Sequence, residues 1–267
     1  MKRLMAVLLL LGALAGRAEA QGQPPAFAVS PRILNIELLD SCIRALTPEA
    51  GADEKRLLGL LTTALAYVSA GKADEFLDDA NRALAAEPKS SIVLIYRAFA
   101  QHTKKHWHAA IKDLDDAIAA NNATKSVMAI AYYLHGDFNW GMNDGGIALK
   151  DSDSAIALNP KLAPAYSMKG SLLAENMKIR EAADALDKAI SVDPGEPSGY
   201  VARGNFRSEH GSATDAIRDI TRAIELNPRN PLPYSLRARL YFYKGDHDSA
   251  DRDSDQAAKI LAEIEGQ

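Results

Sequence analysis

One short pattern recurs every 34 residues along most of this chain, and that repeat limits the possible folds more than any other feature. The tracts AIALNP (155–160), AISVDP (189–194) and AIELNP (223–228) follow one another at this spacing. A tyrosine, a small residue and an alanine recur with the same period. In chain order they are Tyr132, Gly136 and Ala148; Tyr166, Gly170 and Ala182; Tyr200, Gly204 and Ala216; and Tyr234, Ala238 and Ala250. Such a repeat predicts a stack of similar units instead of one central core.

The residue types within the repeat predict two antiparallel helices in each unit. Two helix backbones approach closely only where the contacting side chain is small, which explains the recurring glycine and alanine. Leucine and isoleucine recur at the spacing of a buried helix face. Pro160, Pro194 and Pro228 lack a backbone donor and are expected to end the second helix of a unit. Because strand patterns are absent from the sequence, we expect an all-α fold.

This pattern resembles the repeat of the tetratricopeptide repeat (TPR) family. The match rests on an aromatic residue at unit position 4, a small residue at 8, alanine at 20 and 27, and proline at 32. Two units depart from this pattern: Leu60 and Leu94 replace the aromatic residue at position 4, and Phe76 replaces the small residue at position 20. The resemblance implies a right-handed α-solenoid of about six helix-turn-helix units within residues 57–264, with 125–128 as an insertion. The expected units are 57–90, 91–124, 129–162, 163–196, 197–230 and 231–264.

The beginning of the chain has the pattern of a secretory signal peptide, residues 1–20. A basic start precedes an apolar run, and Ala18 and Ala20 form the expected cleavage site. The run is shorter than the roughly 20 residues that span a bilayer, so we expect no stable membrane insertion after cleavage. Residues 21–30 are expected to form a flexible arm. The short signal and its Ala-x-Ala site predict a bacterial protein that is periplasmic or secreted.

Residues 31–56 are expected to hold a capping helix and a linker before the first unit. Apolar residues recur at helical spacing between Pro31, which suits the first position of a helix, and Thr47. This helix would either cap the exposed face of the first unit or lie in the concave groove and cover it. Cys42, the single cysteine, is expected to fill a buried apolar site, with a redox role or a link between two chains as alternatives.

A second periodic signal is a cation at unit position 7, followed sixteen residues later by an aspartate. A cation in a helix interface needs a fixed carboxylate, so we predict structural hydrogen bonds between helices. The expected pairs are Arg97 with Asp113, His135 with Asp151, Arg203 with Asp219, and Arg237 with Asp253. The fourth unit has Lys169 but Ala185, and Lys169 is expected to meet Asp184 or solvent. A role for these cations as ligand clamps is the alternative.

The resemblance also implies where a partner binds. In TPR proteins the first helix of each unit lines a concave channel, in which partner peptides lie. Carried over by unit position, the groove residues of this chain are Tyr133, Asp137, Trp140, Ser171, Glu175, Asn205, Glu209, Arg239 and Tyr243. Toward the first units these positions become apolar, as at Leu61 and Phe99, which predicts an interface or a covered surface.

The sequence identifies no catalytic residues, and we expect no enzyme activity and no cofactor. It contains no phosphate-binding glycine loop, nucleophile elbow or zinc-protease motif. With 31 Lys and Arg against 35 Asp and Glu, its net charge of −4 provides no positive field for nucleic acid. His102, His106 and His108 have partial metal-ligand spacing, but the expected turn at 105–106 separates them, so they are interpreted as solvated turn residues.

Together these features predict a non-catalytic interaction scaffold or adaptor of the bacterial cell envelope that binds a protein or peptide in its concave groove. Fold alone does not fix function, so two alternatives stay open. One is a metal- or ligand-binding periplasmic protein or an accessory subunit of an envelope enzyme, with its site at the histidines or in the loop 135–146. The other is a structural homo-oligomer, such as a homodimer formed through Tyr241, Phe242 and Tyr243.

Overall fold

The computed structural model describes residues 31–46 and 51–266, which form thirteen α-helices and no strand. This architecture confirms the all-α prediction. The expected signal peptide and arm, 1–30, lie outside the described residues. The helices are α2 (Pro31–Arg44), α3 (Ala52–Ser69), α4 (Ala73–Ala86), α5 (Ser91–Thr103), α6 (Trp107–Ala120), α7 (Lys125–Gly141), α8 (Gly145–Leu158), α9 (Ala163–Glu175), α10 (Ile179–Val192), α11 (Pro197–His210), α12 (Ala213–Leu226), α13 (Pro231–Tyr243) and α14 (His247–Glu265).

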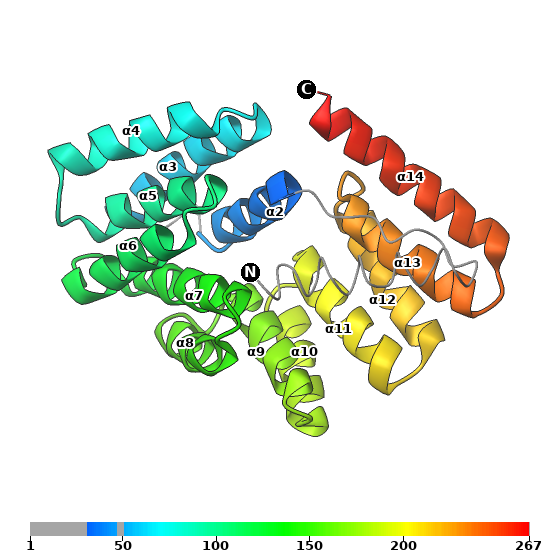
Figure 1. Ribbon diagram of the computed structural model, residues 1–267. Coiled ribbons are helices and arrows are strands. Elements are labelled where there is room, and N and C mark those ends of the chain that lie inside the picture. Colours follow the sequence, from blue (N-terminus) through cyan, green and yellow to red (C-terminus); the bar gives the residue numbers. More distant parts are fainter. Residues whose placement is uncertain (1–30, 47–50, 267) are drawn as a thin grey trace.

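Twelve of these helices form six antiparallel pairs, from α3 with α4 to α13 with α14, and the pairs stack into a curved solenoid (Figure 1). The second helix of each pair packs on the first helix of the next pair. A single pair has too little apolar surface to bury by itself, so stability accumulates along the stack. The α-solenoid expected from the repeat is therefore confirmed.

Glycine is required where the two helices of a pair approach most closely. A Cβ atom added to Gly170 would lie 2.6 Å from Cγ of Leu186, and one added to Gly204 would lie 2.6 Å from Cδ1 of Ile220. Leu186 and Ile220 are fully buried on the second helix of each pair. The small residue at unit position 8 is thus set by the distance between the two helices.

A residue in the left-handed conformation closes the turn inside five of the six pairs. The residues are Gly71, Lys105, Asn143, Met177 and Gly245, with φ between 59° and 80°. The turn of the α11–α12 pair has Gly211 at the corresponding place, but there φ is −146°. Left-handed backbone is disfavoured for residues with a side chain, so the fold imposes it on Lys105, Asn143 and Met177.

The four extra residues expected before the third unit form the first turn of α7. Val127 is fully buried and Met128 is 2 % exposed. Thr124, the residue before α7, donates its hydroxyl to Oε1 of Glu54 (2.5 Å) and its amide to Oδ2 of Asp53 (3.1 Å). The additional turn therefore ties the start of α7 to the start of α3, two pairs earlier.

Candidate functional site: the concave surface

Helix α2 does not extend the stack but lies inside its curve, where it packs against α3 and α5 (Figure 1). Leu39 and Cys42 of α2 are fully buried, in one hydrophobic core with Leu61 of α3 and Phe99 of α5. Leu61 and Phe99 are groove positions that the sequence marks as apolar. Of the two places expected for this helix, the structure therefore shows the one in the groove.

Three polar contacts hold α2 to parts of the solenoid that are far apart in sequence. Asn35 Oδ1 lies 2.7 Å from Nδ1 of His102 on α5. Ser41 Oγ donates to Oε1 of Glu196, the N-cap residue of α11, at 3.0 Å. Arg44 donates to the carbonyl oxygen of Gly195 at 3.5 Å. The helix thus reaches from the second pair to the start of the fifth.

The nine predicted groove residues fall into two zones. The α2-covered zone contains the residues on α7, where Tyr133 is 8 % exposed and Asp137 and Trp140 are partly exposed. The open zone contains the residues on α9, α11 and α13. Its members are the partly exposed Ser171, Asn205 and Arg239 and the exposed Glu175, Glu209 and Tyr243.

Carboxyl groups gather where α2 meets α7 and the start of α11. Desolvation, together with the charges of Glu196 and Asp40, raises the pKa of Glu37 to about 8. Desolvation raises the pKa of Asp137 to about 6. Desolvation also raises the pKa of Glu196, although the hydrogen bonds that this carboxylate accepts lower it. Oε1 of Glu37 is buried without a hydrogen-bond partner. The contact between α2 and the groove therefore places acids near acids.

Cys42 lies among these carboxyl groups. Its pKa is raised well above the ordinary thiol value by desolvation and by the charges of Asp137 and Glu196. The thiol is fully buried, so it stays protonated and is unreactive while α2 is docked. Burial agrees with the interpretation of Cys42 as apolar filling, and a link between two chains would require α2 to leave the groove.

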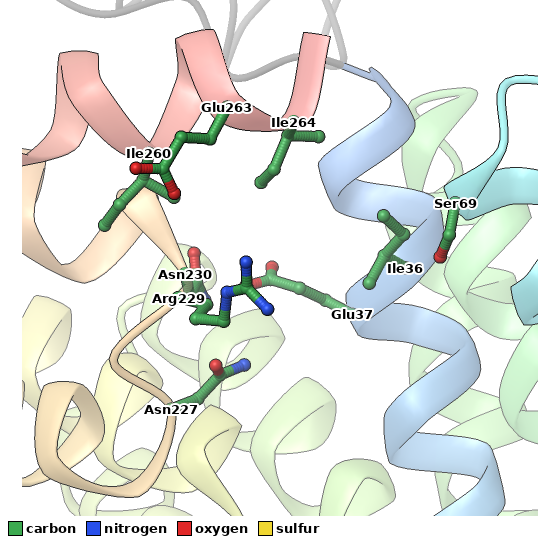
Figure 2. A pocket seen from close by; sticks show the side chains of 9 residues that line it. All are labelled: Ile36, Glu37, Ser69, Asn227, Arg229, Asn230, Ile260, Glu263 and Ile264. Atoms are coloured by element: carbon green, nitrogen blue, oxygen red, sulfur yellow. The ribbon is translucent and has the colours of Figure 1, made fainter. Parts of the chain in front are cut away.

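A cavity of about 300 Å³ lies at the edge of this contact, between α2, the loop from α12 to α13, and α14 (Figure 2). Its apolar wall comes from Ile36 of α2 and from Ile260 and Ile264 of α14. Figure 2 shows Glu37 extending from α2 toward the loop that carries Arg229.

The structure brings together the cation and aspartate of each predicted pair. Arg203 donates from Nε and Nη2 to the two carboxylate oxygens of Asp219, at 2.9 and 2.8 Å, and the arginine pairs 97–113 and 237–253 have the same bidentate geometry. His135 Nδ1 lies 2.7 Å from Oδ2 of Asp151. The aspartates of all four pairs are buried, as a structural role requires.

Three of these cations also contact an acceptor in the preceding unit. These contacts are not among those that the sequence predicted. His135 Nε2 lies 3.1 Å from Asp115, Arg203 donates to Asp187 at 2.7 Å, and Arg237 donates to Thr221 at 3.0 Å. Lys169 follows the same rule and donates to Asp153 at 2.6 Å, so the expectation that it meets Asp184 or solvent was wrong. These acceptors all occupy unit position 25, a signal that a search upstream of each cation would have found.

His102 differs from the solvated turn residue that the sequence predicted. Its ring stacks on Phe138, with centroids 4.1 Å apart, and meets Trp107 edge-on at 4.8 Å. Desolvation lowers the pKa of His102 to about 4, so the ring is neutral and serves packing. His106 and His108 are exposed, as expected. Within residues 31–46 and 51–266, no group of three His, Cys, Asp or Glu side chains is placed to hold a metal ion.

The aromatic residues near the C-terminus are partly used inside their own unit. The ring of Tyr241 lies 5.9 Å from the guanidinium of Arg237, and Phe242 packs edge-on against His247 at 5.1 Å. Tyr243 is 60 % exposed. Dimerisation through this surface stays a prediction.

None of the helices in the described part of the chain combines the length and apolar character needed to cross a membrane.

Comparison with solved structures identifies the type of α-solenoid. No protein-family model matches the chain, and no curated protein matches it in sequence. Among solved structures, a tetratricopeptide repeat protein from Parabacteroides merdae is similar, with a TM-score of 0.53 and 16% identity over 79% of this chain and 86% of that one. The chain has the fold of a TPR solenoid. Two further solved structures are similar to this chain. PilF of Pseudomonas aeruginosa has a TM-score of 0.57 and 16% identity over 80% of this chain and 100% of that chain, and BtubC of P. vanneervenii has a TM-score of 0.54 and 13% identity over 82% and 94%.

Proposed function

We propose that this protein is a non-catalytic interaction scaffold that binds a segment of another polypeptide on the open zone of its concave surface. The observation that carries the proposal is the contrast between the two zones. On α7 Tyr133 is buried and Asp137 and Trp140 are partly exposed, whereas the positions on α11 and α13 include the exposed Glu209 and Tyr243 beside the partly exposed Asn205 and Arg239. TPR solenoids present this curved surface to partners, which supports assigning recognition to it.

The side chains of the open zone suit a polar, extended peptide. Asn205 carries an amide donor and an acceptor that match a peptide backbone. Arg239 and Glu209 offer one charge of each sign, and Tyr243 combines apolar area with a hydroxyl group. A surface of this kind selects by hydrogen-bond pattern and by charge order along the peptide, with less contribution from apolar burial.

The test is site-specific photocrosslinking. A photoreactive residue at position 205 should crosslink to another polypeptide in native envelope extracts, and Arg239→Ala should weaken that crosslink. A photoreactive residue at position 225, on exposed Glu225 of α12, is the matched control. Equal crosslinking from both positions, or none from position 205, would contradict binding in the open zone.

The scaffold is further proposed to act in the bacterial periplasm or outside the cell, on the basis of residues 1–20. Expression of the full chain in a bacterium should give a periplasmic or secreted product whose first residue lies near Gln21. Ala20→Tyr should leave the precursor uncleaved, because signal cleavage needs a small residue there. An uncleaved wild-type chain in the cytosol would refute the assignment.

A further inference from the structure

His135 is the member of the row of cations at unit position 7 that titrates near neutral pH. Arg203 and Arg237 bridge their own unit and the preceding one, and an arginine keeps its charge throughout the pH range of folded proteins. His135 occupies the same position in the third unit and contacts an aspartate on each side in the same way. Because the ordinary pKa of histidine lies close to neutral, this bridge can gain and lose its charge.

The two ring nitrogens of His135 have different kinds of partner. Nδ1 lies 2.7 Å from Oδ2 of Asp151, and this buried carboxylate keeps a proton on Nδ1. Nε2 has two neighbours: an acceptor, Oδ1 of Asp115 at 3.1 Å, and a donor, Nδ2 of Asn139 at 3.2 Å. It can donate to Asp115 only when the ring is charged, and it can accept from Asn139 only when the ring is neutral. The charge of the ring therefore selects one of these two contacts.

The two contacts of Nε2 connect different parts of the fold. Asp115 lies on α6, in the second unit, so the contact with Asp115 joins two units. Asn139 lies on α7, one turn after His135, so the contact with Asn139 stays within one helix. The amide of Asn139 also donates to the backbone carbonyl oxygen of His135 at 2.8 Å and keeps this partner in both states. A change of ring charge thus exchanges a contact between units for a local one.

The surroundings of the ring favour its charged form. Within residues 31–46 and 51–266, the charged side chains that contact it are Asp115 of α6 and Asp151 of α8, and none comes from the other helices packed on α7. Desolvation lowers the pKa of His135, but the hydrogen bonds and charges of the two aspartates outweigh it and raise the pKa above the ordinary histidine value. The stability that the charged bridge contributes is therefore present at acidic pH and is lost as pH rises through the raised pKa.

We propose that His135 makes the joint between the second and third units pH-dependent, because its charged ring bridges Asp115 and Asp151 whereas its neutral ring exchanges Asp115 for Asn139. Helix α7, which carries His135, also carries the groove positions Tyr133 and Asp137. The proton on His135 thus sets how firmly this part of the concave surface is joined to the second unit. This property belongs to the stack itself and does not depend on the binding proposed for the open zone.

The first test compares two substitutions at unit position 25. Asp115→Asn removes the acceptor that only the charged ring uses, so it should raise the equilibrium constant for unfolding about threefold at about pH 5.5 and leave it unchanged at about pH 9.5. Asp187→Asn removes the corresponding acceptor of Arg203 and should have the same effect at both pH values, because arginine does not titrate there. Urea unfolding followed by circular dichroism measures both. An effect of Asp115→Asn that is the same at the two pH values would overturn the proposal.

A second test follows the imidazole of His135 directly by NMR titration, with its signal assigned by its loss in His135→Arg. Asp115→Asn should weaken proton binding to the ring about threefold, because the charged form loses an acceptor. Asp116→Asn is the matched control and should weaken it less, because the carboxylate of Asp116 pairs with Lys112 at 2.8 Å on the same helix. Equal shifts of the pKa of His135 in the two variants, or no shift in Asp115→Asn, would show that Nε2 does not donate to Asp115 and would refute the pH-dependent joint.

Discussion

At the scale of single residues, the fold depends on cations that bridge two units. Each such cation has one acceptor sixteen residues after it, in its own unit. It has a second acceptor in the preceding unit, as in Asp187–Arg203–Asp219. The aspartates are buried and the cations are partly exposed. An aspartate that loses its cation is therefore left as a buried, unpaired charge, whereas the cation keeps some contact with solvent. These contacts therefore join successive units as well as the two helices of one unit.

Asp219→Ala should lower the free energy of unfolding by about 3 kcal/mol, since it leaves two arginines in an interface without their carboxylate. Asp219 accepts from Arg203 and also from Arg207, at 2.8 Å. Asp215→Ala, which breaks the exposed pair with Arg218, is the control and should cost less than about 1 kcal/mol. Urea unfolding followed by circular dichroism measures both. Equal effects of the two substitutions would argue against a structural role for the pair.

Glu37 should make stability depend on pH. Its pKa is raised in the folded state to about 8, so the folded chain holds a proton that the unfolded chain has lost, and stability falls as pH rises from about 4.5 to 8. The charged groups around it are Asp40 and Arg44 of α2, Glu196, and Arg229 and Glu263, which line the same cavity as Glu37 (Figure 2). Glu37→Gln should therefore be more stable than wild type at pH 9, with a difference that shrinks toward pH 5. The measurement is urea unfolding at both pH values, and a difference independent of pH would exclude Glu37 as the titrating group.

At the scale of helices, packing distance decides which residues are allowed. Gly170→Ala should destabilise the protein by about 1 to 3 kcal/mol, because the new Cβ overlaps Leu186. Gly59→Ala is the control. Gly59 is exposed on α3 with no atom within 4 Å of an added Cβ, so alanine there should stabilise by roughly 0.5 to 1 kcal/mol. Thermal or urea unfolding distinguishes the two, and the interpretation of position 8 fails if they change stability in the same direction.

The sequence predicts the helices well because each helix is specified locally, by apolar spacing, by small residues at crossings and, after four of the six second helices, by a proline. What it does not predict depends on contacts between distant segments. His102 looks like a turn residue until Phe138 of the next pair is placed beside it. Lys169 has its partner, Asp153, in the preceding unit, whereas the other cations of this position have an aspartate in their own unit. The insertion at 125–128 likewise has its effect through a contact between distant segments, because the turn that it adds to α7 begins beside α3.

At the scale of the whole molecule, α2 adds contacts that a repeat protein built only from neighbouring units would lack. In a solenoid each unit contacts its neighbours, and stability is a sum over adjacent pairs. The hydrogen bond from Ser41 to Glu196 instead joins residues 155 positions apart. No periodic signal marks such a contact, since α2 lies outside the repeat, and its place in the groove could only be offered as one of two alternatives. The docked helix couples the first pairs to the fifth.

Ser41→Ala should loosen this coupling without disturbing any unit. Loss of one buried hydrogen bond costs about 1 kcal/mol, so amides of α2 should exchange with solvent roughly fivefold faster. The first turn of α11 should exchange faster too, because its N-cap residue, Glu196, loses a hydrogen-bond partner. Helices α13 and α14 should be unaffected. Ser154→Ala, whose hydroxyl donates only to the carbonyl of Lys150 within its own helix, is the matched control and should change neither segment. Hydrogen exchange followed by mass spectrometry resolves these segments. If exchange in α2 rose while α11 stayed unchanged, the helix would be a local addition to the first pairs, and the long-range coupling argued from Glu196 would be wrong.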